Sequence, residues 1–374
     1  MQNPIKNLKT KSKRLVATTA LALMAATPVA QACTGLALTA KDGGYVSGRT
    51  VEFGIDLGLN GLFVPRGYAF TGTLPDGKQG MSYTSKYAYL GTNAFGEAAV
   101  VDGLNEKGLA VGMFYFPGFA KYPDPTPQNQ NIALSPTEFP NWILSQFATV
   151  DEVKAQMNNV AIMPTQPKGW PVIPPVHYVV YDAQGKSIVI EPIDGKLSVS
   201  DNPLGVITNS PPFDWHMTNL SNYVNLTPLG TSPKKVDGVE IQAYSTGSGL
   251  GGLPGDFTAP SRFVRAAIFS ASSVTPTDSE DAAKKVLHLL NQFDIPLGAV
   301  RTAEPGGKTQ IEWTLATVAR DPKNFTYYFR TYDNQNLRKI RMDQFDFNGK
   351  QIMQIDYAGG QPIEDVSNTA KPMK

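Results

Sequence analysis

The pattern of apolar and polar positions after residue 33 predicts a mixture of strands and helices. Residues 33–40 and 45–52 alternate loosely on either side of Asp42-Gly43, and an Asp-Gly pair between two such runs is a strong signal for a β-hairpin. Further apolar or alternating runs predict strands at 97–101, 109–116, 176–181, 187–191, 311–319, 325–332 and 339–345. The last three of these form a β-rich group late in the chain.

Helices are expected at three places. Ser135-Pro136-Thr137-Glu138 presents an N-cap residue, a first-turn proline and a capping-box glutamate in the right order. Residues 261–270 and 279–293 are the other two helical segments. The last segment carries its apolar residues on one stripe: Ala282, Val286, Leu289 and Leu290.

The first hairpin predicts which residues lie beside Cys33. If Asp42-Gly43 is a two-residue loop, Lys41 pairs with Gly44 and Cys33 falls opposite Glu52. Arg49 lies three positions from Glu52, so a regular strand would point the two side chains to opposite faces. A strand end or a β-bulge is therefore needed if both side chains serve one site.

The first 32 residues have the three parts of a secretory signal peptide. The basic part contains Lys6, Lys9, Lys11, Lys13 and Arg14. An apolar run from Leu15 to about Met24 follows, and it is too short for a spanning helix, which needs about 20 residues. Ala30-Gln31-Ala32 then supplies an A-x-A cleavage signal. We expect cleavage between Ala32 and Cys33 and export to the periplasm or the medium, with residues 33–374 forming a single domain.

A lipoprotein is the alternative interpretation of this leader, because there too a cysteine follows the cut. Lipid attachment usually prefers leucine three residues before the cysteine and a small residue two before it. Ala30 and Gln31 stand at those positions, so ordinary secretion agrees better with the cleavage pattern.

Charge and cysteine content narrow the function classes. All five leader charges are basic, so residues 33–374 carry 28 basic and 32 acidic residues, a net charge of −4. This balance argues against a nucleic-acid partner or stable membrane binding, which would favour a basic face. Cys33 is the chain's single cysteine, so no disulfide can form within it. A lone thiol kept in an exported protein indicates a functional role.

Cleavage after Ala32 would place the Cys33 thiol beside a free α-amino group on the same residue. An unperturbed α-amine has a pKa of roughly 7.7–8.0 and can act as a base near neutral pH. One residue would then supply both the nucleophile and its general base, as N-terminal threonine nucleophiles do.

Five motifs, in order along the chain, give it a resemblance to the choloylglycine hydrolase family, which includes conjugated bile acid hydrolases and penicillin V acylases. They are Cys33-Thr34, residues 48–52 (GRTVE), residues 102–109 (DGLNEKGL), residues 208–215 (TNSPPFDW) and residues 249–256 (GLGGLPGD) running into Ser261-Arg262-Phe263. The family belongs to the N-terminal nucleophile hydrolases. The resemblance implies an α+β fold, a four-layer αββα sandwich with two antiparallel sheets between helical layers.

The resemblance also implies roles for individual residues. Cys33 matches the nucleophile, and Arg49 matches the arginine that favours its thiolate. Glu52 stands where the family usually has an aspartate that hydrogen-bonds the α-amine. Asn209 matches the oxyanion-hole asparagine, whose donor can be worth on the order of 3 kcal/mol.

Two further positions of the site are matched. Arg262 corresponds to the second arginine. Tyr115 occupies a position that is asparagine in many bile salt hydrolases and tyrosine in penicillin V acylases, which favours the acylases as the model for specificity.

Other motifs do not indicate a cofactor or a metal. Gly247, Gly249 and Gly252 satisfy G-x-G-x-x-G, but Leu253-Pro254-Gly255 follows where a dinucleotide site needs a helix. The histidines lack metal-ligand spacing: His177, His216 and His288. With these three histidines and no G-x-S-x-G motif, a Ser-His-Asp hydrolase is poorly supported.

Two function classes remain open. The first is a cofactor-free hydrolase of a small linear amide, most similar to penicillin V acylase, with conjugated bile salts and N-acyl homoserine lactones as alternative substrates. The second is a non-catalytic envelope lipoprotein modified at Cys33. The family resemblance further implies a homo-oligomer, a tetramer.

Overall fold

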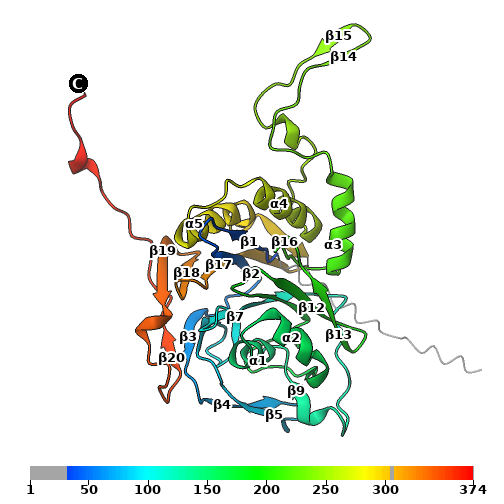
Figure 1. Cartoon of the computed structure of the whole chain (residues 1–374), viewed down its shortest axis with the longest axis vertical. Coiled ribbons are helices and arrows are strands. Elements are labelled where there is room, and N and C mark those ends of the chain that lie inside the picture. The colour runs from blue at the N-terminus through cyan, green and yellow to red at the C-terminus, as the bar shows by residue number, and fades with distance from the viewer. Residues whose placement is uncertain (1–31, 304–306, 374) are drawn as a thin grey trace, which may run out of the picture.

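Two antiparallel sheets lie face to face between two layers of helices (Figure 1). The computed structural model describes residues 32–303 and 307–373, so the expected leader, apart from Ala32, lies outside the described residues. One sheet has the order β1 (Gly35–Thr39), β2 (Tyr45–Phe53), β17 (Thr309–Asp321), β18 (Thr326–Thr331) and β19 (Asn334–Arg341), and β16 (Val300–Ala303) also pairs with β17.

The second sheet is built mostly from the middle of the chain, and its edge strands are β13 and β20. Its order is β13 (Lys196–Asp201), β12 (Ser187–Ile193), β11 (Val176–Tyr181), β8 (Ala110–Tyr115), β7 (Val100–Asn105), β6 (Tyr89–Asn93), β3 (Asn60–Val64) and β20 (Met353–Ile355). Three small pairs complete the strands: β4 (Ala69–Thr73) with β5 (Gln79–Thr84), β9 (Ala133–Leu134) with β10 (Ala161–Ile162), and β14 (Lys234–Val236) with β15 (Val239–Ile241).

The helices form the outer layers. α4 (Ala259–Ser272) and α5 (Ser279–Leu290) pack on the six-stranded sheet, and α1 (Phe139–Gln146) packs on β7 and β8 of the other, with α2 (Val150–Gln156) after it. α3 (Phe213–Asn219) leads toward the arm that ends in β14 and β15 (Figure 1). The expected order of layers, helix, sheet, sheet, helix, is therefore confirmed.

α5 shows how sequence pattern becomes packing in this fold. The Asp278 side chain caps the helix by accepting a hydrogen bond from the Asp281 backbone N–H at 2.9 Å. Its apolar stripe then lies against β2, where a Cβ on Gly48 would come within 2.5 Å of Val286 Cγ1. Glycine at position 48 is what allows the helix to approach the sheet this closely.

The first hairpin forms as expected, but the predicted register was wrong by one residue. Gly35 pairs with Arg49, so the loop contains three residues, Lys41 to Gly43. Gly43 adopts a φ of 83°, and the Ala40 N–H donates to the Gly44 carbonyl at 2.8 Å. A three-residue loop with glycine in the left-handed region adds one residue to the connection. Continuing the register therefore sets Cys33 opposite Val51 instead of Glu52.

β2 itself is continuous from Tyr45 to Phe53, and the irregularity beside Glu52 lies in the neighbouring strand, β17. β17 pairs Thr314 with Glu52 and then Ala316 with Val51, so its register shifts beside Glu52. A bulge bends the strand that carries it, here β17.

Three predicted boundaries were wrong. The strand expected at 97–101 begins at Val100, because residues 95 and 96 turn with positive φ. The strand expected at 339–345 ends at Arg341, where a 3₁₀ turn follows. The helix expected from Ser135 begins at Phe139. The Glu138 carboxylate does accept the Ser135 N–H, at 2.7 Å, but it closes a separate turn before the helix.

A buried polar network joins the two sheets at the centre of the molecule. Arg320 of β17 donates to the Asp102 carboxylate of β7 at 2.9 Å, and both side chains are fully buried. The Tyr327 hydroxyl donates to the other Asp102 oxygen at 2.8 Å.

Within the described ranges, no helix is both long and apolar enough to cross a membrane.

We predict that Asp102→Ala lowers the free energy of unfolding by about 3–5 kcal/mol, because it leaves the Arg320 charge buried without its partner. Urea unfolding measures this difference. As a control, Asp76→Ala breaks the solvent-exposed pair of Asp76 with Lys78 and should cause no measurable change. A loss below about 1 kcal/mol for Asp102→Ala would contradict the prediction.

Candidate active site

Cys33 lies just before β1 and is buried, with 4% of its surface exposed. Its thiol donates to the Glu52 carbonyl oxygen at 3.8 Å. Burial raises the pKa of the thiol, while the nearby positive charges of Arg49 and Arg262 act in the opposite direction. In the structure the Cys33 nitrogen is still bonded to Ala32, so the α-amine that cleavage would create is not present.

Arg49 of β2 places a positive charge beside this thiol. Its guanidinium donates to the carbonyl oxygens of Thr50, at 3.1 Å, and Met113. The guanidinium carbon lies 3.9 Å above the centre of the Phe114 ring. These partners are all uncharged. Among the described residues no carboxylate hydrogen-bonds the Arg49 guanidinium, so its positive charge is not neutralised by an ion pair.

Glu52 is a buried carboxyl group with incomplete hydrogen bonding. One oxygen accepts from the Thr314 hydroxyl at 3.0 Å, and the other, Oε2, has no hydrogen-bond partner among the described residues. Burial raises the pKa of Glu52 to about 8. In the uncleaved chain the group therefore holds its proton at neutral pH.

Arg262 of α4 connects the nucleophile to Asn209. Its Nη1 donates to the Cys33 carbonyl at 2.5 Å and to the Thr34 hydroxyl at 2.9 Å. Its Nη2 donates to Asn209 Oδ1 at 2.7 Å. Burial lowers the pKa of Arg262 to about 10, so the guanidinium remains charged at neutral pH.

Asn209 is oriented by contacts at both ends of its amide. Arg262 binds the amide oxygen, and the amide nitrogen donates to the Tyr115 carbonyl at 2.8 Å. The second hydrogen of that nitrogen has no acceptor among the described residues. The arrangement leaves one N–H available for an oxygen of a bound molecule.

A small pocket opens beside the thiol, with a cavity volume of about 30 Å³. Cys33, Arg49 and Glu52 form its polar end, and Tyr115, Phe53 and Trp170 form an aromatic wall. Phe53 meets the Tyr115 and Trp170 rings edge to face, with centroids 6.1 and 6.0 Å apart. Burial raises the pKa of Tyr115 to about 12, so its phenol is neutral.

The structure thus brings all six residues singled out in the sequence into one region. Arg49, Glu52 and Tyr115 line the pocket with Cys33, and Asn209 and Arg262 are joined to it by hydrogen bonds. Arg262 is 1% exposed, so its guanidinium belongs to the buried part of this region.

Sequence reasoning missed two features near the site. Trp170 lies in an irregular segment between β10 and β11 that carries no motif. Glu312 of β17 is 1% exposed, and neither carboxylate oxygen has a partner among the described residues. Burial raises the pKa of Glu312 to about 7, against the opposing effect of Arg262. A charged residue between the apolar Ile311 and Trp313 of a strand was the signal that could have found it.

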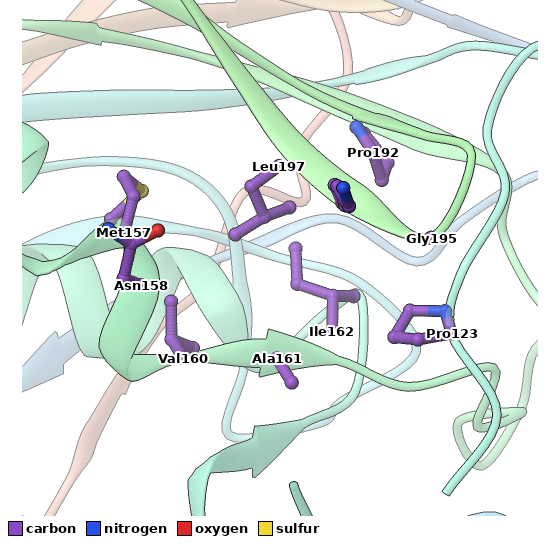
Figure 2. A pocket seen from close by; sticks show the side chains of 10 residues that line it. Pro123, Met157, Asn158, Val160, Ala161, Ile162, Pro192, Gly195 and Leu197 are labelled. Carbon is purple, nitrogen blue, oxygen red and sulfur yellow. The ribbon is translucent and has the colours of Figure 1, made fainter.

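Over residues 32–303 and 307–373, no group of histidine, cysteine and acidic side chains is arranged to hold a metal. A second pocket is lined mainly by apolar residues such as Met157, Ile162 and Leu197 (Figure 2). It shares no lining residue with the pocket at Cys33.

Comparison with known proteins places this geometry in a family. Residues 33–355 match the family described as "Linear amide C-N hydrolases, choloylglycine hydrolase family". The chain belongs to this family. It is therefore a linear amide C–N hydrolase with the fold of the N-terminal nucleophile hydrolases.

Curated relatives and solved structures agree with this assignment. The chain is 32% identical to a bile salt hydrolase/transferase of Clostridium perfringens, over 87% of this chain and 97% of that protein. It is 27% identical to a penicillin V acylase of Pectobacterium atrosepticum, over 92% and 89% of the two chains. A crystal structure of a mutant conjugated bile acid hydrolase from Clostridium perfringens matches with a TM-score of 0.79 and 31% identity, over 90% and 100%.

We predict that Glu52→Gln becomes increasingly stabilising as the pH rises, in a chain that keeps a peptide bond before Cys33. The ordinary carboxyl pKa is 4.5 and the folded value is about 8. Between these values the unfolded state has lost its proton while the folded state retains it, so the wild type loses stability relative to the glutamine variant. The difference should level off above about pH 8.

Urea unfolding of both proteins between about pH 5 and pH 9 measures this effect. A difference that stays constant across the range, or shrinks as the pH rises, would show that Glu52 ionises normally in the folded chain.

Proposed function

We propose that the exported chain is cleaved between Ala32 and Cys33 and that Cys33 is then the nucleophile of the amide hydrolysis. The observation that carries this proposal is the position of Cys33. It is the first residue of the family match and lines the pocket, and the charges of Arg49 and Arg262 act on its thiol.

Cleavage would supply the group that this site needs. The new α-amine takes the thiol proton, and the thiolate attacks the amide carbonyl. The Asn209 N–H stabilises the negative charge that develops on the carbonyl oxygen. The amine product leaves with the proton from the α-ammonium, and water then attacks the thioester to release the acid and regenerate Cys33.

Glu52 and the two arginines complete this mechanism. Glu52 Oε2 has no partner among the residues that the structure describes, so an α-ammonium on Cys33 would give it a donor and favour its ionised form. Arg49 favours the thiolate. Arg262 holds the Cys33 carbonyl and the Asn209 amide in one arrangement.

The pocket favours an aromatic acyl group of modest size, as in penicillin V. Tyr115, Phe53 and Trp170 offer flat apolar surfaces to such a group. Conjugated bile salts are the second candidate, supported by the 32% identity to a bile salt hydrolase/transferase.

We also propose a homo-oligomer as the assembled form, with the arm around β14 and β15 as a contact surface. The arm stands away from the body (Figure 1). It exposes Val224, Leu229, Val239 and Tyr244, each with more than 60% of its surface accessible. Apolar surface of this kind is typical of protein contacts.

We predict that phenoxyacetyl amides such as penicillin V are hydrolysed with a higher kcat/KM than glycine- or taurine-conjugated bile salts. A parallel assay of these substrates and an N-acyl homoserine lactone, with Cys33→Ala as the inactive control, measures the preference. Tyr115→Asn should move the ratio toward bile salts by about tenfold, since one changed pocket contact alters discrimination by roughly 1–3 kcal/mol.

Tyr87→Asn is the matched control, because Tyr87 does not line the pocket and its replacement should leave the ratio unchanged. A wild-type preference for bile salts, or a ratio that Tyr115→Asn does not alter, would assign Tyr115 to packing alone. Two results together would exclude the lipoprotein alternative. Cys33→Ala loses all amide hydrolysis, and the intact mass of the wild-type protein equals that of a chain that starts at an unmodified Cys33.

A further inference from the structure

Two buried histidines that the proposed mechanism does not use bind the peptide backbone on either side of the Asn209 α-carbon. His177 of β11 lies with Nε2 3.0 Å from the Thr208 carbonyl oxygen. His216 of α3 lies with Nε2 2.9 Å from the Asn209 carbonyl oxygen. The two side chains are 1% and 2% exposed. Consecutive carbonyl groups are thus each held by an imidazole ring.

The protons on these rings follow from their partners. A carbonyl oxygen only accepts hydrogen bonds, so each Nε2 carries the hydrogen. Burial lowers the pKa of His216 to about 4, so its ring is neutral and Nδ1, which has no partner among the described residues, carries no hydrogen.

Glu191 and an aromatic ring fix the orientation of His177. Its Nδ1 lies 3.1 Å from Glu191 Oε1, and the same carboxylate accepts the Phe213 backbone N–H at 3.1 Å. The imidazole stacks on Phe116, with centroids 4.3 Å apart and planes 4° from parallel. The ring therefore has little freedom to turn away from the Thr208 carbonyl.

The neighbouring residues extend this hold on the Thr208-Asn209 segment. Ile207 exchanges two backbone hydrogen bonds with Gly35, at 2.8 and 3.0 Å, which ties the segment to the strand after Cys33. The Thr208 hydroxyl donates to the Ala259 carbonyl at 3.1 Å, close to Arg262 in α4. The Asn209 amide can point at a reacting carbonyl only if this backbone stays in place.

We propose that His177, oriented by Glu191, and His216 are positioning residues that fix the Asn209 amide for oxyanion stabilisation. The proposal rests on the function proposed above. The two histidines then affect kcat through Asn209, because the oxyanion donor acts in the transition state. A displacement of about 1 Å in such a group can lower the rate about 10²-fold.

Substitution by phenylalanine tests this effect. His177→Phe keeps a flat ring over Phe116 and removes the donor to the Thr208 carbonyl, and His216→Phe removes the donor to the Asn209 carbonyl. Each should lower kcat by about 10–100-fold and change KM by less than about threefold. His288→Phe is the matched control, because His288 is exposed on α5, and both constants should stay at the wild-type values.

A pair of amide substitutions separates positioning from packing. A glutamine at position 177 can place its amide nitrogen near the position of His Nε2, whereas the shorter asparagine cannot. His177→Gln should therefore retain most of the wild-type kcat, and His177→Asn should be as impaired as His177→Phe. Equal kcat values for His177→Gln and His177→Asn would overturn the proposal. This comparison does not depend on whether the phenylalanine variants fold.

A double-mutant cycle tests whether His177 acts through Asn209. Asn209→Ala alone should lower kcat by roughly 10²–10³-fold. In that background His177→Phe should cost less than about threefold more, because the donor it positions is already gone. Effects that simply multiply would overturn the proposal.

The single variants distinguish the two levels of the argument. If Asn209→Ala retains the wild-type kcat, the oxyanion role in the proposed function fails, and the positioning role fails with it. If Asn209→Ala is impaired but His177→Phe and His216→Phe keep the wild-type kcat, only the positioning role is overturned.

Discussion

The site depends on the hydrogen bonds that the guanidinium group of Arg262 makes. This group binds the Cys33 carbonyl, the Thr34 hydroxyl, the Asn209 amide oxygen and the Phe257 carbonyl, and so joins the start of β1 to the Thr208-Asn209 segment and to α4. A buried cation is stable only when such acceptors surround it. The planar fork of arginine can bind several acceptors in fixed directions, which lysine cannot do. Arg262 is thus the direct link between Cys33 and the Asn209 amide, while His177, His216 and the Gly35–Ile207 pair hold the backbone that carries this amide.

The electrostatics around Cys33 are the reason that the proposed mechanism requires cleavage before this residue. Burial disfavours the thiolate and also raises the pKa values of Glu52 and Glu312, so in the uncleaved chain the site is held away from its ionised form. Arg49 and Arg262 act in the opposite direction on Cys33. A positively charged α-ammonium beside Glu52 would add the charge and the hydrogen-bond donors that the uncleaved chain lacks.

The five motifs were sufficient to predict the order of layers and the residues around the thiol, because they carry the resemblance to the choloylglycine hydrolase family; the periodicity of the chain agreed with that fold but did not establish it. The sequence could not predict the register of the first hairpin, since one left-handed glycine, Gly43, lengthens the loop by a residue. Trp170 was missed because long-range packing of an irregular segment leaves no local pattern. His177 and His216 were tested only for metal-ligand spacing, and a contact from an imidazole to a backbone carbonyl has no spacing rule.

The most direct test of this account measures amide hydrolysis by one preparation before and after its N-terminus is released. The chain is produced with an N-terminal extension whose removal leaves Cys33 as the first residue. The unfolding temperature and kcat are measured for the extended form and for the form without the extension. The account predicts two folded proteins with similar unfolding temperatures, of which only the form with a free Cys33 α-amine hydrolyses the amide. Full turnover by the extended form would contradict it, because the α-amine could then not be the base.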